Sequence, residues 1–176
     1  AIKEEFAQIS VTCTAPSKTF NIASMMISNI FIPNRELKTK FRAQLDAAGI
    51  SQLNVLGLVA CEAAYAHGEE WYEAMHAYVA DNIAFTKEYV ETQLPGVSMV
   101  DHEGTYLVWL DFRETGLSVD ELEDLIVHRA KLWLDSGKIF GGCGKGFQRI
   151  NVACPRATLQ EALDRIKTAM KESEAQ

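Results

Sequence analysis

Lys18 combines a reactive side chain with a sequence context in which an ordinary surface lysine is not expected. A strand-like segment from Ile9 to Ala15 ends at Pro16, and Lys18 follows in a stretch of small and hydroxyl-bearing residues, 17–21. A lysine that is partly desolvated at such a place favours its neutral amine, which can add to a carbonyl compound. The alternative is a lysine whose aliphatic stem lies along the end of a core strand while its ammonium group reaches water. The residues around Lys18 leave both interpretations open.

Arg149 is the second candidate, because it interrupts a strand pattern that otherwise favours burial. The predicted strand 147–153 follows a glycine-rich loop at residues 141–146. A buried guanidinium group needs a partner, and its planar fork matches a carboxylate through two parallel hydrogen bonds. A structural Asp or Glu and the carboxylate of a bound substrate satisfy this need equally well. Arg156, at the entrance of the closing helix, is interpreted as structural.

The other motifs argue against several kinds of site. The glycine-rich loop lacks the Gly-Lys-Ser/Thr ending of a phosphate-binding loop and leads into a strand, so nucleotide binding is not expected. No serine lies in a Gly-x-Ser-x-Gly elbow, so a hydrolase triad has no support. Trp109 and Tyr106 fit a strand pattern and are expected in the core. A zinc site is not expected, because the cysteines are far apart and have no CxxC spacing; they are Cys13, Cys61, Cys143 and Cys154.

Strands and helices alternate in the first part of the chain. Residues 9–15 and 28–32 are predicted to be strands, and Asn34 is predicted to cap a helix that ends before Gly49. Residues 54–67 are small and apolar, which predicts a helix buried on several faces. A long amphipathic helix is then predicted from Gly68 to Leu94, ended by a Pro-Gly pair.

The second part of the chain shows strand periodicity first and helical periodicity after it. Strands are predicted at 97–100, 105–112 and 147–153. Ser118 with Glu121 predicts a capping box for a helix whose apolar spacing runs to Trp133, and Thr158 with Glu161 predicts another for the closing helix. Together these patterns predict an α/β or α+β chain in which a small second domain begins near residue 68.

Composition describes an ordinary globular protein. The 176 residues are 48% hydrophobic and 23% charged, which is enough apolar content for a core. The net charge of −7 and the absence of a strongly basic patch argue against nucleic-acid binding. No apolar run is long enough to cross a membrane. The scattered cysteines fit a reducing, cytoplasmic setting.

Three segments together resemble one known family. They read APSKTFNIA at 15–23, GTYLVWLD at 104–111 and GFQRINVACPR at 146–156. In this order they are similar to the pyridoxal-phosphate (PLP)-dependent enzymes of fold type I, in the class I/II aminotransferase superfamily. Within it they look like the C–S lyases of the cystathionine β-lyase kind, the PatB/MalY group. The resemblance runs from about Ile9 to Met170.

The resemblance implies an architecture and a set of site residues. Residues 1–67 match the C-terminal end of the large PLP-binding domain, and residues 68–176 match the long linking helix and the small α/β C-terminal domain. Lys18 matches the lysine that forms the Schiff base with PLP, and Ser17 lies where a hydroxyl helps to hold the cofactor phosphate. Arg149 matches the arginine that binds the substrate α-carboxylate, and no metal is implied.

Two positions depart from the pattern common in the superfamily. Met26 stands where many aminotransferases carry an arginine for the cofactor phosphate. The lyase branch also lacks that arginine, so Met26 favours a lyase over an aminotransferase. Ser24 stands where a glycine is common, and we expect this change to be tolerated.

The function that the resemblance implies for the intact enzyme is β-elimination of a cysteine S-conjugate to a thiol, pyruvate and ammonia. A class I/II aminotransferase is the first alternative, because the same lysine and arginine would serve it. The second alternative is that the chain alone is a non-catalytic folded fragment, since the family's phosphate-binding loop, its ring-stacking aromatic and the aspartate on the pyridine nitrogen lie upstream of the lysine. The family also implies an amino-acid substrate, a homodimer, a cytoplasmic location and a place in amino-acid metabolism.

Overall fold

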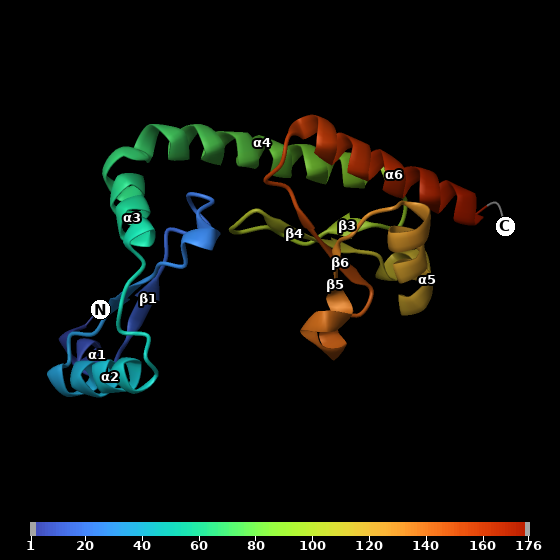
Figure 1. Ribbon diagram of the computed structural model, residues 1–176. Coiled ribbons are helices and arrows are strands. Elements are labelled where there is room, and N and C mark those ends of the chain that lie inside the picture. Colours follow the sequence, from blue (N-terminus) through green and yellow to red (C-terminus); the bar gives the residue numbers. More distant parts are fainter. Residues whose placement is uncertain (1–2, 175–176) are drawn as a thin grey trace. The chain divides into compact units, whose positions relative to one another are not determined.

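The computed structural model describes residues 3–174 of the chain, without the side chain of Glu174. The chain divides into two compact units, Ala1–Met75 and His76–Gln176, each of which is described by itself (Figure 1). The division falls inside helix α4 (Glu69–Gln93), a little beyond the predicted boundary between residues 67 and 68. Of the predicted domain ranges, residues 1, 2, 175 and 176 lie outside the described part. The functional assignment of the two parts stays a prediction.

Unit 1 contains a small antiparallel sheet and three helices that precede α4. Strand β1 (Thr12–Thr14) pairs with β2 (Asn29–Phe31), with Cys13 opposite Ile30. The two predicted strands are therefore confirmed, although both are shorter than expected. The helical segments are α1 (Glu4–Ala7), a 3-10 turn η1 (Ala23–Met25), α2 (Arg35–Ala47) and α3 (Val55–His67).

Two asparagines begin the longer helices of unit 1. The Asn34 side chain accepts a hydrogen bond from the Leu37 amide at 3.0 Å, which confirms the predicted cap of α2. The Asn54 side chain accepts from the Leu56 amide at 3.1 Å and starts α3. Its Nδ2 also donates to the Met25 carbonyl oxygen at 3.2 Å, so the same residue ties α3 to the turn η1.

The predicted burial of α3 is wrong for this chain. Only Gly57 and Cys61 of this helix are buried. Val55 and Leu56 are 70% and 69% exposed. Helix α3 is apolar as expected, but the described residues of unit 1 place no second layer over most of it.

Unit 2 contains a four-stranded antiparallel sheet in the order β3-β4-β6-β5. These strands are β3 (Ser98–Met99), β4 (Leu107–Asp111), β5 (Asp135–Ser136) and β6 (Phe147–Asn151). The remaining elements are α5 (Val119–Asp124), which continues into a π-helical turn η3 (Leu125–Arg129), α6 (Arg156–Glu174), and three 3-10 turns, η2 (Arg113–Thr115), η4 (Gly137–Phe140) and η5 (Gly142–Gly144).

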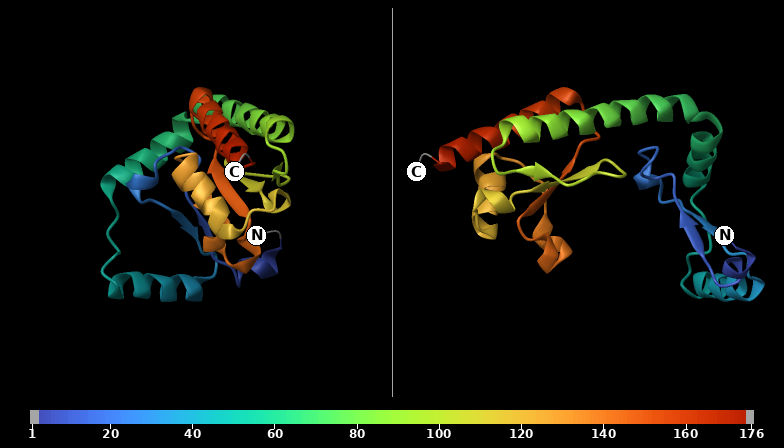
Figure 2. Two further views of the ribbon diagram at one scale, coloured as in Figure 1. Left: turned by 90° about the vertical axis from the view of Figure 1, so that its right-hand side faces the viewer. Right: turned by 180° about the vertical axis from the view of Figure 1, so that it is seen from behind.

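The core of unit 2 lies on one face of this sheet. The even-numbered residues of β4 and β6 are buried there: Val108, Leu110, Gln148 and Ile150. Helix α6 runs along the C-terminal part of α4 in the same direction, as Figures 1 and 2 show. The helical residues that complete the core are almost fully buried: Val90, Leu122, Leu125, Ile126, Leu159, Leu163 and Ile166.

A buried polar group fixes the connection between β6 and α6. Asn82 of α4 is fully buried, and its Nδ2 donates to the carbonyl oxygens of Val152 at 2.7 Å and Cys154 at 2.9 Å. Its Oδ1 accepts from Arg156 Nε at 2.7 Å. The Arg156 guanidinium group also lies 4.4 Å from the ring centroid of Phe85. These contacts support the structural interpretation of Arg156.

Helix boundaries in unit 2 agree with the sequence where the signal is local. The capping box at Ser118 is confirmed, since its Oγ accepts from the Glu121 amide while Glu121 Oε2 accepts from the Ser118 amide. The predicted helical placement of Trp133 is wrong, because the helix ends at Arg129 and Lys131 adopts a positive φ of 55°. The predicted capping box at Thr158 is also wrong, because α6 already begins at Arg156 and its first helical hydrogen bonds end on the Pro155 carbonyl.

Membrane insertion has no support from the helices. Within residues 3–174, none combines the length and the apolar character that crossing a bilayer requires.

Candidate functional site

Lys18 lies in a turn that directly follows strand β1. The Phe20 amide donates to the Pro16 carbonyl at 2.9 Å, and the Ile22 amide donates to the Ser17 carbonyl at 3.0 Å. Pro16 is buried and Ser17 is half-buried. These contacts give the backbone around Lys18 a defined conformation.

The side chain of Lys18 is exposed, so the expected partial desolvation is not found in this chain. Across the described residues, neither Lys18 Nζ nor Ser17 Oγ makes a hydrogen bond or an ion pair. The physical reason is the one that applies to α3, since no further layer among residues 3–75 covers the turn. Lys18 Nζ is therefore accessible to a ligand.

An aromatic cluster, which the sequence analysis missed, anchors this turn. The ring of Phe20 lies 5.9 Å from that of Tyr65, 6.0 Å from that of Trp71 and 6.3 Å from that of Tyr72, measured between centroids. A Cβ atom at Gly68 would lie only 2.6 Å from Phe20 Cε1, so the ring packs on the glycine between α3 and α4. The pairing of an aromatic two residues after the lysine with a glycine between two helices was the available signal.

The segment after the turn is held against the start of α3. A Cβ atom at Gly57 would lie 2.7 Å from the Met25 carbonyl oxygen, which only a glycine permits. Met26 follows in the left-handed region with φ 49°, and its side chain is 86% exposed. Position 26 thus presents an apolar side chain to solvent.

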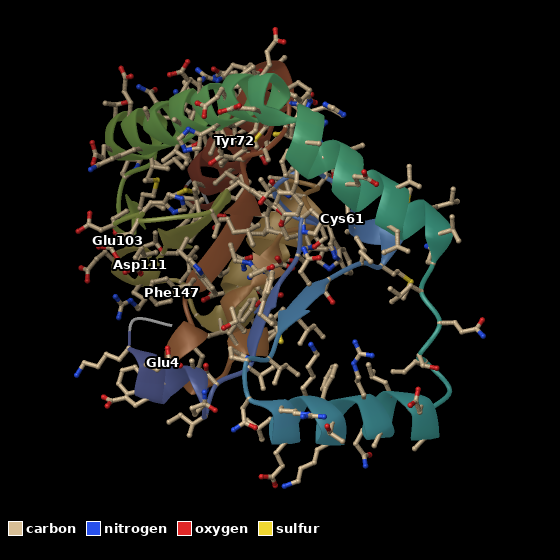
Figure 3. The ribbon with its side chains drawn as sticks, turned by 90° about the vertical axis from the view of Figure 1, so that its left-hand side faces the viewer. Glu4, Cys61, Tyr72, Glu103, Asp111 and Phe147 are labelled. Atoms are coloured by element: carbon tan, nitrogen blue, oxygen red, sulfur yellow. The ribbon has the colours of Figure 1, made fainter. Side chains whose placement is uncertain are left out.

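A thiol–amide contact joins helix α3 to strand β2 in unit 1. Cys61 of α3, labelled in Figure 3, lies 3.8 Å from Asn29 Nδ2 of β2, measured at its sulfur. All four cysteines are free thiols. No group of three or more His, Cys, Asp and Glu side chains suited to a metal ion occurs within residues 3–174.

Arg149 lies on β6, between Asp135 on β5 and Trp109 on β4. Asp135 Oδ2 accepts from Arg149 Nη2 at 2.6 Å and from Arg149 Nε at 3.1 Å. The Arg149 side chain is 24% exposed, so the guanidinium group is half-buried. The structure therefore contains the structural ion pair that the sequence left open as one alternative, although the sequence did not identify Asp135.

Two aromatic rings complete the surroundings of Arg149. Its guanidinium carbon lies 4.6 Å from the ring centroid of Phe140 and 5.9 Å from that of Trp109. The two rings contact each other edge to face at 5.0 Å. The expected core positions of Trp109 and Tyr106 are wrong, because both residues are half-buried and Trp109 lies on the sheet face opposite the core.

A second arginine cluster lies on the same face of the sheet. Asp111 and Phe147, labelled in Figure 3, are opposite each other on β4 and β6. Arg113 donates to both carboxylate oxygens of Asp111 through Nε at 2.9 and 3.1 Å, and its guanidinium group lies 4.7 Å from the Phe147 ring centroid. The hydrogen bonds from Arg113 lower the pKa of Asp111 below its ordinary 3.8, with burial opposing them in part.

The predicted site residues thus divide between the two units. Unit 1 brings Ser17 and Lys18 together, and unit 2 carries Arg149. The two side chains of unit 1 fit PLP. The Lys18 amine can react with the PLP aldehyde, and the Ser17 hydroxyl can donate a hydrogen bond to the PLP phosphate. The partly paired guanidinium group of unit 2 fits an α-carboxylate.

Known relatives and solved structures resemble almost the whole chain. No protein-family model matches it. It is 42% identical over 170 residues to cystathionine beta-lyase PatB of Bacillus subtilis, which covers 97% of this chain and 44% of the relative. It is 34% identical over 173 residues to cystathionine beta-lyase of Corynebacterium glutamicum, which covers 96% of this chain and 45% of the relative.

Solved structures give the same result. Cystalysin from Treponema denticola, whose structure contains pyridoxal 5'-phosphate, matches with a TM-score of 0.93 and 38% identity over 97% of this chain and 43% of its own. A PLP-bound C–S lyase from Staphylococcus hominis matches with a TM-score of 0.80 and 32% identity over 91% of this chain and 41% of its own. The chain spans less than half the length of each of these proteins.

Proposed function

Because this chain belongs to the PLP-dependent enzymes of fold type I, in the branch of the cystathionine β-lyases, we propose that the enzyme built on it is a carbon–sulfur β-lyase. Its substrate is a cysteine S-conjugate, and its products are a thiol, pyruvate and ammonia. The observation that carries this proposal is the free amine of Lys18 in an anchored turn, within a chain that resembles cystathionine β-lyases along nearly its whole length.

The residues of unit 1 serve the cofactor and the proton transfer. When bound, PLP supplies an aldehyde for a lysine amine and a ring that withdraws electrons from the substrate Cα. Lys18 Nζ would hold the cofactor through its aldehyde, and the same amine would accept the substrate Cα proton. Ser17 Oγ donates a hydrogen bond to the phosphate.

Arg149 of unit 2 orients the substrate. Its guanidinium group binds the α-carboxylate, which fixes the direction of the Cα–H bond relative to the base. In this proposal unit 1 is the C-terminal end of the large PLP-binding domain, and unit 2 with its part of α4 is the small C-terminal domain. The enzyme acts as a homodimer in the cytoplasm, as its family relation suggests.

An aminotransferase is the second candidate. The chain is 25% identical over 166 residues to aspartate aminotransferase of Pyrococcus horikoshii, and the same lysine and arginine would serve that reaction. Met26, at the position where many aminotransferases carry an arginine, favours the lyase.

The test uses a polypeptide of the full family length that contains this chain. We expect it to release pyruvate and thiol from cystathionine without an added keto acid. Lys18→Ala should abolish this release, whereas Lys38→Ala, which removes an exposed lysine of α2, should preserve it. A requirement for a keto-acid acceptor would contradict the lyase proposal and support the aminotransferase.

A further inference from the structure

The guanidinium group of Arg149 has one edge already occupied. A guanidinium group carries five N–H donors, one on Nε and two on each Nη. Asp135 Oδ2 accepts from Nε at 3.1 Å and from Nη2 at 2.6 Å, so a single oxygen covers the side edge. The contact is built into the sheet, because Asp135 and Arg149 are directly opposite each other in the β5–β6 register.

The plane of the guanidinium group is also fixed. Phe140 of η4 lies 4.6 Å from the guanidinium carbon, and Trp109 of β4 lies 5.9 Å from it. Cations are attracted to aromatic rings at such distances, and the interaction strengthens where water is excluded. Three elements of unit 2 therefore hold Arg149 from different sides.

The end edge of the guanidinium group, formed by Nη1 and Nη2, still has N–H groups without a partner among the described residues. No hydrogen-bond partner of Arg149 Nη1 is found within residues 3–174, and Nη2 keeps one N–H beyond its bond to Asp135. Two parallel N–H groups on Nη1 and Nη2 are the arrangement that a carboxylate binds through both oxygens. A ligand carboxylate can thus bind Arg149 without displacing Asp135.

We propose that Asp135 is a positioning residue that holds the side edge of Arg149 so that its end edge receives the substrate α-carboxylate. This inference rests on the proposed function of Arg149. It also predicts the direction in which removal of Asp135 changes the affinity for a carboxylate. If Asp135 were only a competing charge, its removal would tighten carboxylate binding. If Asp135 positions the fork, its removal weakens binding.

The experiment follows the guanidinium nitrogens of Arg149 by ¹⁵N NMR in the 176-residue chain, with L-alanine as the ligand and L-alaninamide as the control without a carboxylate. In the unchanged protein, alanine should shift the Nη1 and Nη2 signals and leave Nε in place. In Asp135→Ala, all three nitrogens should shift and the dissociation constant should rise about fivefold, as expected for one misplaced hydrogen bond. Asp135→Asn keeps an acceptor oxygen and should recover most of the affinity.

Three results would overturn the inference. Asp135→Ala that binds alanine equally or more tightly would show that Asp135 competes or has no role. A shift of Nε in the unchanged protein would show that the ligand displaces Asp135. The absence of any carboxylate-dependent shift at Arg149 would refute carboxylate binding by this residue, and with it the role of Asp135. If Asp135→Ala does not fold, the Nε shift in the unchanged protein and the affinity of Asp135→Asn decide the question.

Discussion

The two units of this chain hold their candidate residues in opposite ways. In unit 2, Arg149 contacts a carboxylate and two aromatic rings, all from the same unit. In unit 1, the backbone around Lys18 is anchored through Phe20, but the amine itself contacts nothing among the described residues. Unit 2 thus fixes the side chain of its candidate residue through contacts of its own, whereas unit 1 fixes only the backbone around Lys18.

The same contrast holds for packing. Unit 2 encloses its own core, in which Val90, Val108 and Leu163 have no exposed surface. The buried apolar residues of unit 1 are few, and Ile27 and Ile32 still keep 8% and 9% of their surface exposed. Burial of apolar surface is the main favourable term in folding, so stability should be concentrated in unit 2. Substitutions in each unit test this difference.

Leu163→Ala should give the largest effect. Its side chain is fully buried, and truncation of such a leucine costs about 2–5 kcal/mol because a cavity remains. Leu58→Ala in α3 is the matched control, since this leucine is 44% exposed and its truncation should cost within about 0.5 kcal/mol. Urea unfolding, followed through amide exchange in each unit, measures both. Equal losses would contradict the contrast between the units.

Asn82→Ala should show that unit 2 also depends on a buried polar group. It leaves the carbonyl oxygens of Val152 and Cys154 and the Nε of Arg156 without their partner, at a cost of about 2–4 kcal/mol in the free energy of unfolding. Thr92→Ala, which removes an exposed hydroxyl of the same helix, is the control and should cost little. A small effect of Asn82→Ala would mean that the β6–α6 connection does not need this network.

Gly68→Ala should loosen the turn of Lys18. The added methyl group would collide with the Ala64 carbonyl oxygen and lie 2.6 Å from Phe20 Cε1, so the end of α3 and the Phe20 ring must both shift. The total cost should be about 1–3 kcal/mol, with about 1 kcal/mol from the displaced ring. We expect amide exchange at Ile22, which donates to the Ser17 carbonyl, to become about fivefold faster. Gly104→Ala in unit 2 is the control, because a methyl group there meets no atom within 4 Å. Unchanged exchange at Ile22 would show that the aromatic cluster does not anchor the turn.

Acid should remove a small contribution of Asp111 to the stability of unit 2. Arg113 holds the folded-state pKa of Asp111 below its ordinary 3.8. This contribution is therefore present above that value and is lost as the pH falls through the lower folded-state pKa. The loss should be at most about 1 kcal/mol, because Arg113 is exposed and water screens the pair. Asp111→Asn should flatten the acid dependence of the free energy of unfolding, as measured by urea unfolding at a series of pH values.

The sequence predicts those parts of the fold that depend on neighbouring residues. The cap at Asn34, the capping box at Ser118 and the stop of α4 before Pro95 follow from local chemistry, and all three are found. The start of α6 is local too, but Pro155 accepts the first helical hydrogen bonds ahead of Thr158. The alternation of residues along β4 also predicts two faces of the strand. The prediction that Trp109 lies in the core did not take this alternation into account.

The partners of the candidate residues could not be predicted in the same way. Asp135 meets Arg149 only because β5 pairs with β6, and a sequence pattern does not fix that register. Phe20 meets Gly68 across 48 positions of sequence through the packing of α3 and α4 on the turn. The exposure of α3 depends on which residues pack over it, and the sequence of this apolar helix does not determine them.

The most direct test of the account locates the amine that reacts with PLP. A polypeptide of the full family length that contains this chain is incubated with PLP, the adduct is reduced with borohydride, and the pyridoxyl group is mapped by mass spectrometry of peptides. Reduction traps the adduct even where binding is weak. We predict that Lys18 carries most of the label, well above the exposed lysines Lys38 and Lys145, and that Lys18→Ala removes it. Equal labelling of all exposed lysines, or none at Lys18, would contradict the claim that this turn presents the cofactor-binding amine.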